Sequence, residues 1–331
     1  MSGNPNAAPD NGRAIAIFRS LAEVPSGFGP TVAAVGNFDG VHLGHREILA
    51  AVADEAHETG GRAVAITFEP HPERFLRPAQ APRLITPLPE RLRLLAETGI
   101  DAVLVLPFNA TLANLTPREF AGRILVSALG VRSVHEGQNF RFGRGAAAGV
   151  RELAAMGAQL GFAVRVHQAV RVRGLEVSSS AVRSLIGEGD VSRVRWILGR
   201  PFTVLSKRAS GRGIGTRQLV PTVNLAPYDG LLPAFGVYVT RLLVNGRAFQ
   251  AVTNVGNRPT FGEESFAVES HILDSGPIDI EEQTPLELEF LLHLRGEREW
   301  SSPKALKTQI FKDVARAKRY FQLARLLPGG A

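Results

Sequence analysis

The sequence predicts two domains, an α/β domain with a Rossmann-like parallel sheet followed by a small antiparallel β-barrel with a C-terminal helix. The chain has 331 residues, which is too long for one average domain and fits two. Short β-branched runs alternate with helical stretches through the first 200 residues, a pattern typical of a doubly wound sheet. After Gly199-Arg200-Pro201 the strand-like runs follow one another without helices, which favours an antiparallel barrel.

The first part of the chain shows five apolar runs of strand length and six segments with helical periodicity. The expected strands are Thr31–Val35, Ala63–Phe68, Ala102–Leu106, Val131–His135 and Phe162–Val166. The expected helices are Arg46–His57, Glu90–Glu97, Pro117–Leu129, Arg151–Gln159, Ser180–Gly187 and Val191–Leu198. We therefore place the α/β domain at residues 13–200, after a polar tail of residues 1–12 that we expect to be disordered.

The second part, residues 201–331, shows the sequence pattern of a barrel closed by one helix. Its expected strands are Phe202–Ser206, Gly236–Val244, Arg247–Asn254, Ala267–Leu273 and Leu286–Leu294. Asn245-Gly246 is a hairpin turn signal between two of them. The only long helical pattern is Lys304–Leu326, which we expect to close the barrel.

Composition excludes several classes of function. The chain has no cysteine, which excludes disulfides, thiolate metal sites and cysteine nucleophiles. The net charge of +7 is spread evenly, which argues against a nucleic-acid-binding tail. No signal peptide or membrane-length apolar run is visible, so a cytoplasmic location is expected. Residues 1–200 contain no lysine, so a P-loop is excluded there and a nucleotide would be held by His, Arg and backbone amides.

Residues 36–45 read Gly-Asn-Phe-Asp-Gly-Val-His-Leu-Gly-His and join the first of these strands to a helix. His42 and His45 are three residues apart and share one face of a first helical turn. Gly40 and Gly44 let backbone approach a bulky anion, and a helix start attracts negative charge. The pattern favours a phosphate site in which two imidazoles stabilise developing charge, the alternative being two surface histidines near a turn.

Four motifs in this part resemble, in the same order and spacing, those of prokaryotic bifunctional riboflavin kinase/FAD synthetases, within the His-x-Gly-His nucleotidylyltransferases. The first runs from Asn37 to His45, and the second is Thr67-Phe68-Glu69-Pro70-His71-Pro72. The third is Gly137-Gln138-Asn139-Phe140-Arg141-Phe142-Gly143, and the fourth is Ser178-Ser179-Ser180-Ala181-Val182-Arg183, with Ser180 where the family usually has Thr. The resemblance covers nearly the whole chain past the tail.

The resemblance implies an FMN adenylyltransferase domain. The FMN phosphate would attack the α-phosphorus of ATP directly, so catalysis needs positioning and charge neutralisation rather than a protein nucleophile. It implies catalytic roles for His42, His45 and Arg183 at the ATP phosphates. The implied ATP-binding residues are Asn37, Phe38, Asp39, Gly40, Gly44, Ser179 and Ser180, and the implied substrate residues are Phe68, Pro70, His71 and Asn139. A purely turn-shaping role for Pro70 remains the alternative.

The barrel part contains a glycine-rich run, residues 211–215, that precedes Pro221-Thr222-Val223-Asn224. Alone it is consistent with a flexible hairpin end. The Pro-Thr-Val-Asn run resembles the Pro-Thr-Ala-Asn element of riboflavin kinases. The resemblance implies phosphate contacts at Gly211 and Gly213, and Mg²⁺ ligation at Thr222 and Asn224, whose side chains offer hard oxygen atoms.

Further family motifs follow in order and imply the rest of a riboflavin kinase site. Glu269 occupies the place of the base that takes the proton of riboflavin's primary alcohol. Without the resemblance, Glu269 would be interpreted as an acid on the outward face of a strand. Arg295 is implied in flavin binding, and Trp300 stands where the family usually has Phe. The chain departs from the family pattern at Leu219 and across residues 279–284.

The sequence therefore predicts a bifunctional enzyme that converts riboflavin to FMN and then to FAD with ATP and Mg²⁺. The expected partners are riboflavin, FMN and ATP, with no nucleic acid and no membrane, and the oligomeric state is left open. Two enzyme alternatives are a different His-x-Gly-His nucleotidylyltransferase, which leaves the second half unexplained, and a class I aminoacyl-tRNA synthetase, which needs a lysine signature. A third alternative is a flavin- or nucleotide-binding regulator without catalysis.

Overall fold

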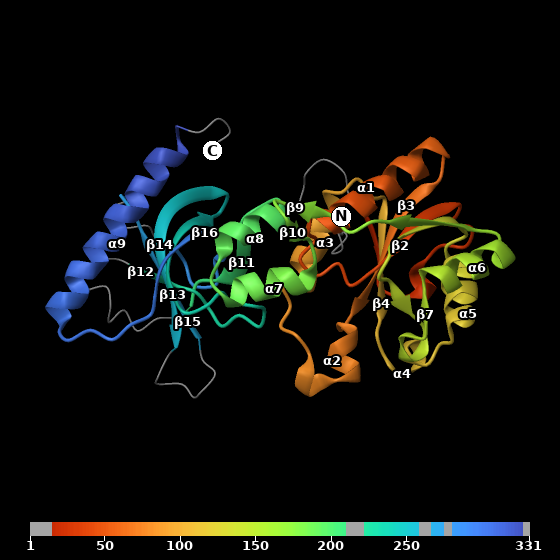
Figure 1. Ribbon diagram of the computed structural model, residues 1–331, viewed down its shortest axis with the longest axis horizontal. Helices are drawn as coiled ribbons and strands as arrows, with labels where there is room; N and C mark the ends of the chain where they lie inside the picture. The colour runs from red at the N-terminus through yellow and green to blue at the C-terminus, as the bar shows by residue number, and fades with distance from the viewer. Residues whose placement is uncertain (1–14, 210–221, 258–265, 275–279, 327–331) are drawn as a thin grey trace. The chain divides into compact units, whose positions relative to one another are not determined.

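The computed structural model describes residues 15–209, 222–257, 266–274 and 280–326, so the predicted tail of residues 1–12 lies outside the described part (Figure 1). The chain divides into two compact units, Met1–Ser179 and Ser180–Ala331. The helices α7 (Ser179–Gly187) and α8 (Val191–Leu198) fall largely or wholly in the second unit, and α8 packs on its strands. The domain boundary near residue 200 stays a prediction.

The first unit contains the predicted parallel sheet. Its six strands lie in the order β1-β4-β3-β2-β5-β8, and every neighbouring pair is parallel. The strands are β1 (Ala16–Phe18), β4 (Ala102–Pro107), β3 (Arg62–Glu69), β2 (Thr31–Val35), β5 (Val131–Gly137) and β8 (Ala163–His167). The chain runs from β2 outward through β3 and β4, and then returns to place β5 on the other side of β2. The carboxyl ends of β2 and β5 thus form a topological switch point, where ligands bind in open α/β sheets.

Alternating side chains on β2 explain the layers of this unit. Val32 and Ala34 face one core, and Ala33 and Val35 face the other, as the period of two in a strand requires. Two helices pack on the first face, and two helices with a helical extension pack on the second face (Figure 1). They are α1 (Leu43–Glu58) and α3 (Leu88–Ala96) on the first face, and α5 (Pro117–Phe120), η3 (Ala121–Ala128) and α6 (Val150–Leu160) on the second.

The segment predicted as one helix over Pro117–Leu129 differs in detail. It begins as a short α-helix with a capping box formed by Thr116 and Glu119, and then continues as eight residues of π-helix. The change in hydrogen-bond spacing leaves the apolar side intact, because Phe120, Ile124 and Leu125 remain buried. Shorter elements are η1 (Leu21–Glu23), α2 (Pro72–Leu76), η2 (Pro78–Gln80), α4 (Ala110–Ala113), β6 (Arg141–Phe142), η4 (Arg144–Ala146), β7 (Ala148–Gly149), β9 (Arg171–Val172) and β10 (Leu175–Glu176).

The second unit contains the predicted antiparallel sheet, curved as a half-barrel (Figure 1). Its strand order is β11-β16-β13-β14-β15-β12, with every neighbouring pair antiparallel. The strands are β11 (Phe202–Lys207), β16 (Pro285–Gly296), β13 (Gly236–Val244), β14 (Arg247–Asn257), β15 (Phe266–Ile272) and β12 (Thr222–Asn224). The hairpin at Asn245-Gly246 joins β13 to β14 with positive φ at both residues, as its sequence predicts.

The two faces of this sheet differ in what covers them. On one face a chain of buried hydroxyl groups crosses three strands, from Thr240 to Thr253 (2.7 Å) and from Thr253 to Ser270 (2.8 Å). The long helix α9 (Pro303–Ala324), capped by Ser302, covers part of the other face, where its Phe321 packs in the apolar core. A site on this second face is therefore bounded by the sheet and α9.

Candidate active sites

The loop after β2 turns into α1 at His42, which caps the helix. The Nδ1 atom of His42 accepts a hydrogen bond from the backbone N–H of His45 at 3.2 Å. The two imidazole rings stack with their centroids 3.6 Å apart and their planes 13° apart. Because Nδ1 is an acceptor, neutral His42 carries its proton on Nε2, which makes Nε2 a hydrogen-bond donor. The predicted histidine pair is thus brought together at a helix N-terminus.

Buried contacts of Asp39 hold this loop in place. Its carboxylate accepts the backbone N–H groups of Ile85 (3.1 Å) and Thr86 (2.9 Å), and the Thr86 hydroxyl accepts the N–H of Gly40 (2.9 Å). Asp39 is 1% exposed, so its visible role is to shape the loop, and an ATP contact stays a prediction. A Cβ atom at Gly44 would lie 3.3 Å from the ring of His42, so glycine there leaves room for the stacked rings.

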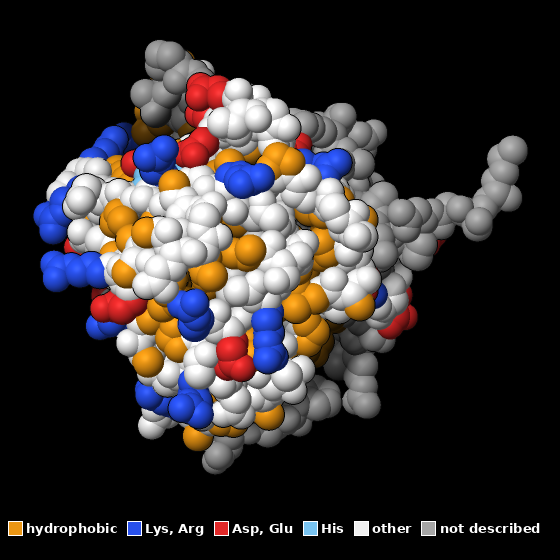
Figure 2. All heavy atoms as spheres, turned by 90° about the vertical axis from the view of Figure 1, so that its right-hand side faces the viewer, with side chains coloured by type: hydrophobic (Ala, Val, Ile, Leu, Met, Phe, Trp, Pro, Cys, Tyr) orange, Lys and Arg blue, Asp and Glu red, His pale blue; other side chains and the backbone are white. Residues whose placement is uncertain are grey.

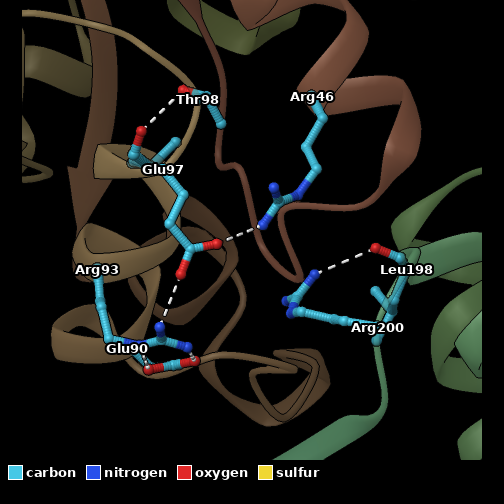
Figure 3. Close-up of polar contacts among 8 residues, drawn as sticks. Arg46, Glu90, Arg93, Glu97, Thr98, Leu198 and Arg200 are labelled. Carbon is cyan, nitrogen blue, oxygen red and sulfur yellow. Dashed lines mark hydrogen bonds and ion pairs between the residues drawn. The ribbon is translucent and has the colours of Figure 1, made fainter. Parts of the chain in front are cut away.

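An ion-pair network fixes the start of α1 against α3 (Figure 3). Arg46, next to His45 in the sequence, donates to Glu97 at 2.9 Å, and Arg93 donates to the other oxygen of Glu97 at 2.7 Å. Arg93 also makes a two-pronged contact with Glu90 at 2.7 and 2.8 Å. The network is partly exposed and contributes more to orientation than to stability.

A cavity of about 570 Å³ opens beside this loop, at the carboxyl end of the sheet. Gly36 and Asn37 of the loop line it together with Phe68 at the end of β3. The ring of Phe68 meets that of Phe108 edge-on at 5.7 Å. Five aromatic side chains contribute to the wall, which suits a flat aromatic ligand. They are Phe68, Phe108, Phe120, Phe140 and Phe142.

Four of these phenylalanines were not predicted as site residues. Phe108 follows β4 directly, and Phe140 and Phe142 follow β5 within the quoted third motif. Each follows the carboxyl end of a strand, which is the signal that could have identified it. Phe120 belongs to a helix on the flank of the sheet, and nothing in its local sequence indicated a cavity.

The other residues predicted for the first site differ in whether they lie at the His42 loop or at the cavity. Pro70 is exposed after a cis peptide bond, and His71 is buried and caps α2 by accepting the N–H of Glu73 at 3.2 Å. Asn139 lies exposed in the turn after β5 and is not among the residues that line the cavity. The Ser179 hydroxyl donates to the carbonyl of Asp39 at 2.9 Å, so Ser179 is brought to the loop.

Ser180 and Arg183 lie on α7 in the second unit. Their implied roles at the ATP phosphates stay predictions. A carboxyl group that the sequence did not single out lies at the switch point itself. Glu136, near the end of β5, is 4% exposed and accepts the backbone N–H of Val35 at 2.7 Å. Burial raises the pKa of Glu136 well above its usual value, so this group favours its neutral form.

The second candidate site lies on the half-barrel, where register aligns polar residues across three strands. Asn224 on β12 pairs with Glu269 on β15, which in turn pairs with Asn254 on β14. Thr222 stands two residues before Asn224, on the same face of its strand. The Oδ1 atom of Asn224 is buried and has no hydrogen-bond partner among the described residues. Asn224 is not among the residues that line the neighbouring cavity.

A cavity of about 440 Å³ lies between this part of the sheet and α9. Four predicted residues line it: Thr222, Glu269, Arg295 and Trp300. Its remaining walls come from strand residues, from the loop before α9 and from α9 itself. They are Val237, Val252, Asn254, His271, Glu297, Arg298, Leu306, Ile310, Asp313 and Val314.

Arg295 in this cavity is held by a buried carboxylate. Its Nε atom donates to Asp313 of α9 at 3.0 Å, and Gln309 donates to the other oxygen of Asp313 at 2.8 Å. The guanidinium groups of Arg298 and Arg295 lie 3.8 and 5.3 Å from the ring centre of Trp300. The sequence missed Asp313, since a lone acid on an amphipathic helix gives no signal of the strand it will face.

Three sequence positions of interest, Gly211, Gly213 and Leu219, lie outside the described residues. Within the described part of the chain, no group of three His, Asp or Glu side chains is arranged to hold a metal ion. Among the described helices, none has both the length and the hydropathy needed to cross a bilayer. On the face shown in Figure 2, the basic side chains lie scattered between apolar and uncharged groups and form no continuous basic surface.

Comparisons with known proteins assign both halves of the chain. Residues 25–181 match the family model of FAD synthetase, and residues 198–321 match that of riboflavin kinase. The chain is 36% identical over 288 residues to a bifunctional riboflavin kinase/FMN adenylyltransferase of Pseudomonas fluorescens. The alignment spans 87% of this chain and 92% of that protein. It is 32% identical over 295 residues to the protein of that name from Escherichia coli K12, with 89% and 94% coverage.

A solved structure shares the whole fold. The crystal structure titled as a macrolide-efflux protein from Streptococcus pneumoniae superposes with a TM-score of 0.80 and covers 92% of this chain and 99% of its own. Its sequence identity is 24%, so this likeness supports the fold alone. The relatives and the two domain models together carry the assignment. The chain belongs to the family of bifunctional riboflavin kinase/FMN adenylyltransferases.

Proposed function

We propose that this chain catalyses both reactions of its family at separate sites. Riboflavin is phosphorylated by ATP at the half-barrel cavity, and FMN is adenylylated by a second ATP at the α/β cavity, releasing pyrophosphate. One observation carries the proposal: each domain has its own cavity lined by residues of its own family motifs. These are Asn37 and Phe68 in the first domain, and Thr222 and Glu269 in the second.

In adenylyl transfer a phosphate oxygen of FMN attacks the α-phosphorus of ATP, and the bond from that phosphorus to the bridging oxygen of pyrophosphate breaks. No proton has to leave the ionised phosphate, so the protein supplies position and positive charge. On this proposal the Nε2–H of His42, with His45 stacked beside it, donates to the phosphates at the start of α1. The phenylalanine wall holds the flavin ring, while Ser179, Ser180 and Arg183 are further phosphate contacts on this proposal.

In the kinase reaction the primary alcohol of riboflavin attacks the γ-phosphorus of ATP, and ADP leaves. The alcohol must lose its proton, and Glu269 in the cavity is the base. Mg²⁺ fits Thr222 and Asn224, because both offer neutral oxygen atoms and the buried Asn224 Oδ1 has no hydrogen-bond partner within the described part of the chain. When bound there, the ion neutralises phosphate charge. Arg295 and Trp300, which also line the cavity, hold the flavin.

The substrates are riboflavin, FMN and ATP, with Mg²⁺ as the metal in both steps. A cytoplasmic location is part of the proposal, and the cysteine-free sequence is compatible with a reducing compartment. No nucleic acid or membrane enters the proposal.

The test is to incubate the purified chain with riboflavin and ATP, with MgCl₂ or with EDTA, and to separate the flavins by chromatography over time. With Mg²⁺ we expect FMN to rise and then FAD to accumulate, and with EDTA we expect neither. Accumulation of FMN alone would contradict the adenylyl-transfer assignment. No conversion at all would favour a flavin- or nucleotide-binding regulator.

A further inference from the structure

Arg91 is a fully buried arginine on α3 that links the two signature segments of the first domain. It is 0% exposed. Its Nη1 donates to the carbonyl of Asn37 at 2.9 Å, and its Nη2 donates to the carbonyl of Phe68 at 3.2 Å and to a carboxylate oxygen of Glu69 at 2.9 Å. Asn37 begins the loop that carries His42, while Phe68 and Glu69 end β3. One guanidinium therefore joins the nucleotide loop to the flavin side of the cavity.

The contacts around Arg91 fix the position of the Asn37 peptide. The same carbonyl oxygen also accepts the hydroxyl of Thr67 at 3.2 Å, so two donors converge on it from β3 and α3. Asn37 and Phe68 both line the phenylalanine cavity. A shift of either segment changes the distance between a flavin in the cavity and the histidines of the loop.

The chemistry of this contact requires arginine rather than lysine. A guanidinium is a rigid planar fork whose two amino groups can donate in two directions at once, whereas an ammonium is a single point of charge. Burial lowers the pKa of Arg91, while Glu69 and Asp39 oppose that shift by favouring the charged form. The Glu69 carboxylate is the partner that balances the buried charge.

We propose that Arg91 is a positioning residue for adenylyl transfer, which locks the His42 loop to the end of β3 and so sets the geometry between FMN and ATP. The inference rests on the proposed function of the first domain. Arg91 is fully buried and is not among the residues that line the cavity, so its side chain is not positioned to contact substrate. Its effect is therefore expected in turnover rather than in binding, since a displacement of about 1 Å in a positioned reaction can cost on the order of 100-fold in rate.

The test compares three variants of the full chain, Arg91→Met, Arg91→Lys and Arg123→Met. Arg123 is the matched control, an arginine whose side chain is 63% exposed and pairs with Glu119 at the surface. We expect Arg91→Met to lower kcat for FAD formation by roughly 100-fold, with KM for FMN and for ATP changed by less than about threefold. The kcat of Arg91→Lys should be about tenfold higher than that of Arg91→Met, because lysine restores the positive charge and hydrogen-bond donation from one nitrogen.

Riboflavin phosphorylation, measured in the same samples, reports on the other domain and should be unchanged in all three variants. The positioning role is overturned if Arg91→Met has the kcat of Arg123→Met. It is also overturned if Arg91→Met and Arg91→Lys lose FMN binding to the same extent, because an equal loss of binding would indicate that the domain has unfolded in both variants. His42→Ala is the reference: if it too makes FAD at the normal rate, the proposed adenylyl site fails independently of Arg91.

Discussion

His42 does two things at once, and the two can be separated by substitution. Its Nδ1 caps α1 by accepting the N–H of His45, and its Nε2 carries the proton of the neutral ring. Asparagine is a good N-cap that retains the acceptor but lacks the distant donor. Alanine lacks both groups.

We expect His42→Asn and His42→Ala each to lower FAD formation from FMN by roughly 100-fold or more, the scale of losing one preorganised charge-stabilising donor. Only His42→Ala should also destabilise the first domain, by about 1 kcal/mol, the usual cost of losing a cap. Steady-state assays measure the rate of FAD formation, and thermal unfolding measures the change in stability. A His42→Asn variant with normal FAD formation would show that the cap, and not Nε2, is the function of His42.

Glu136 gives the first domain a pH dependence of predictable sign. Because burial raises its pKa in the folded protein, the folded state binds the proton more tightly than the unfolded chain does. The free energy of unfolding therefore falls as pH rises above the ordinary value near 4.5 and through the raised pKa. Glutamine resembles the neutral acid and can still accept the N–H of Val35.

Glu136→Gln should therefore unfold at a higher temperature than the wild type at pH 8 and show little difference at pH 5. Calorimetry of both proteins between these values measures the effect. The exposed Glu58 on α1 provides the control, since Glu58→Gln should leave the pH dependence unchanged. Equal pH slopes for wild type and Glu136→Gln would mean that the carboxyl group is ionised in the folded state.

At the scale of elements, α9 reaches into the kinase cavity through Asp313. The carboxylate is 2% exposed and holds the Nε of Arg295 at 3.0 Å. Replacing Asp313 with Asn keeps the shape but removes the charge that orients the guanidinium. We expect the KM for riboflavin to rise about tenfold, the scale of one charge-assisted hydrogen bond.

The assay for Asp313→Asn is riboflavin phosphorylation at varied riboflavin and saturating ATP. Lys312→Met, an exposed neighbour on the same helix, should behave as wild type. Adenylylation of FMN should be unaffected in both. An unchanged KM for riboflavin in Asp313→Asn would place Arg295 outside flavin binding.

The sequence predicted long elements well because their periodicity is local. The strands and helices of six or more residues begin and end within three residues of their expected limits, except at the π-helical segment Ala121–Ala128. The three-residue strands β1 and β12 were missed, because three residues are too few to show a period of two.

The candidate sites were predictable only where a motif lies within one short segment. His42 and His45 share one turn, and Thr222 and Asn224 share one strand. Arg91, Glu136 and Asp313 act through contacts with segments more than 15 residues away. Such partners are set by topology and strand register, and a single sequence carries no pattern that reports them.

At the scale of the whole molecule, the central claim is that one chain holds two independent active sites that act in series. His42 and Glu269 lie in different domains and serve different reactions on this account. A variant at either residue should block one reaction and leave the other intact. FMN released by one molecule can then be used by another.

The most direct measurement uses His42→Ala and Glu269→Gln separately and as a mixture, each supplied with riboflavin, ATP and Mg²⁺. We expect His42→Ala to stop at FMN, and Glu269→Gln to leave riboflavin unconverted while still making FAD when FMN is supplied. The mixture should produce FAD from riboflavin. Loss of both reactions in either variant, or a mixture that makes no FAD, would contradict the account of two separate sites.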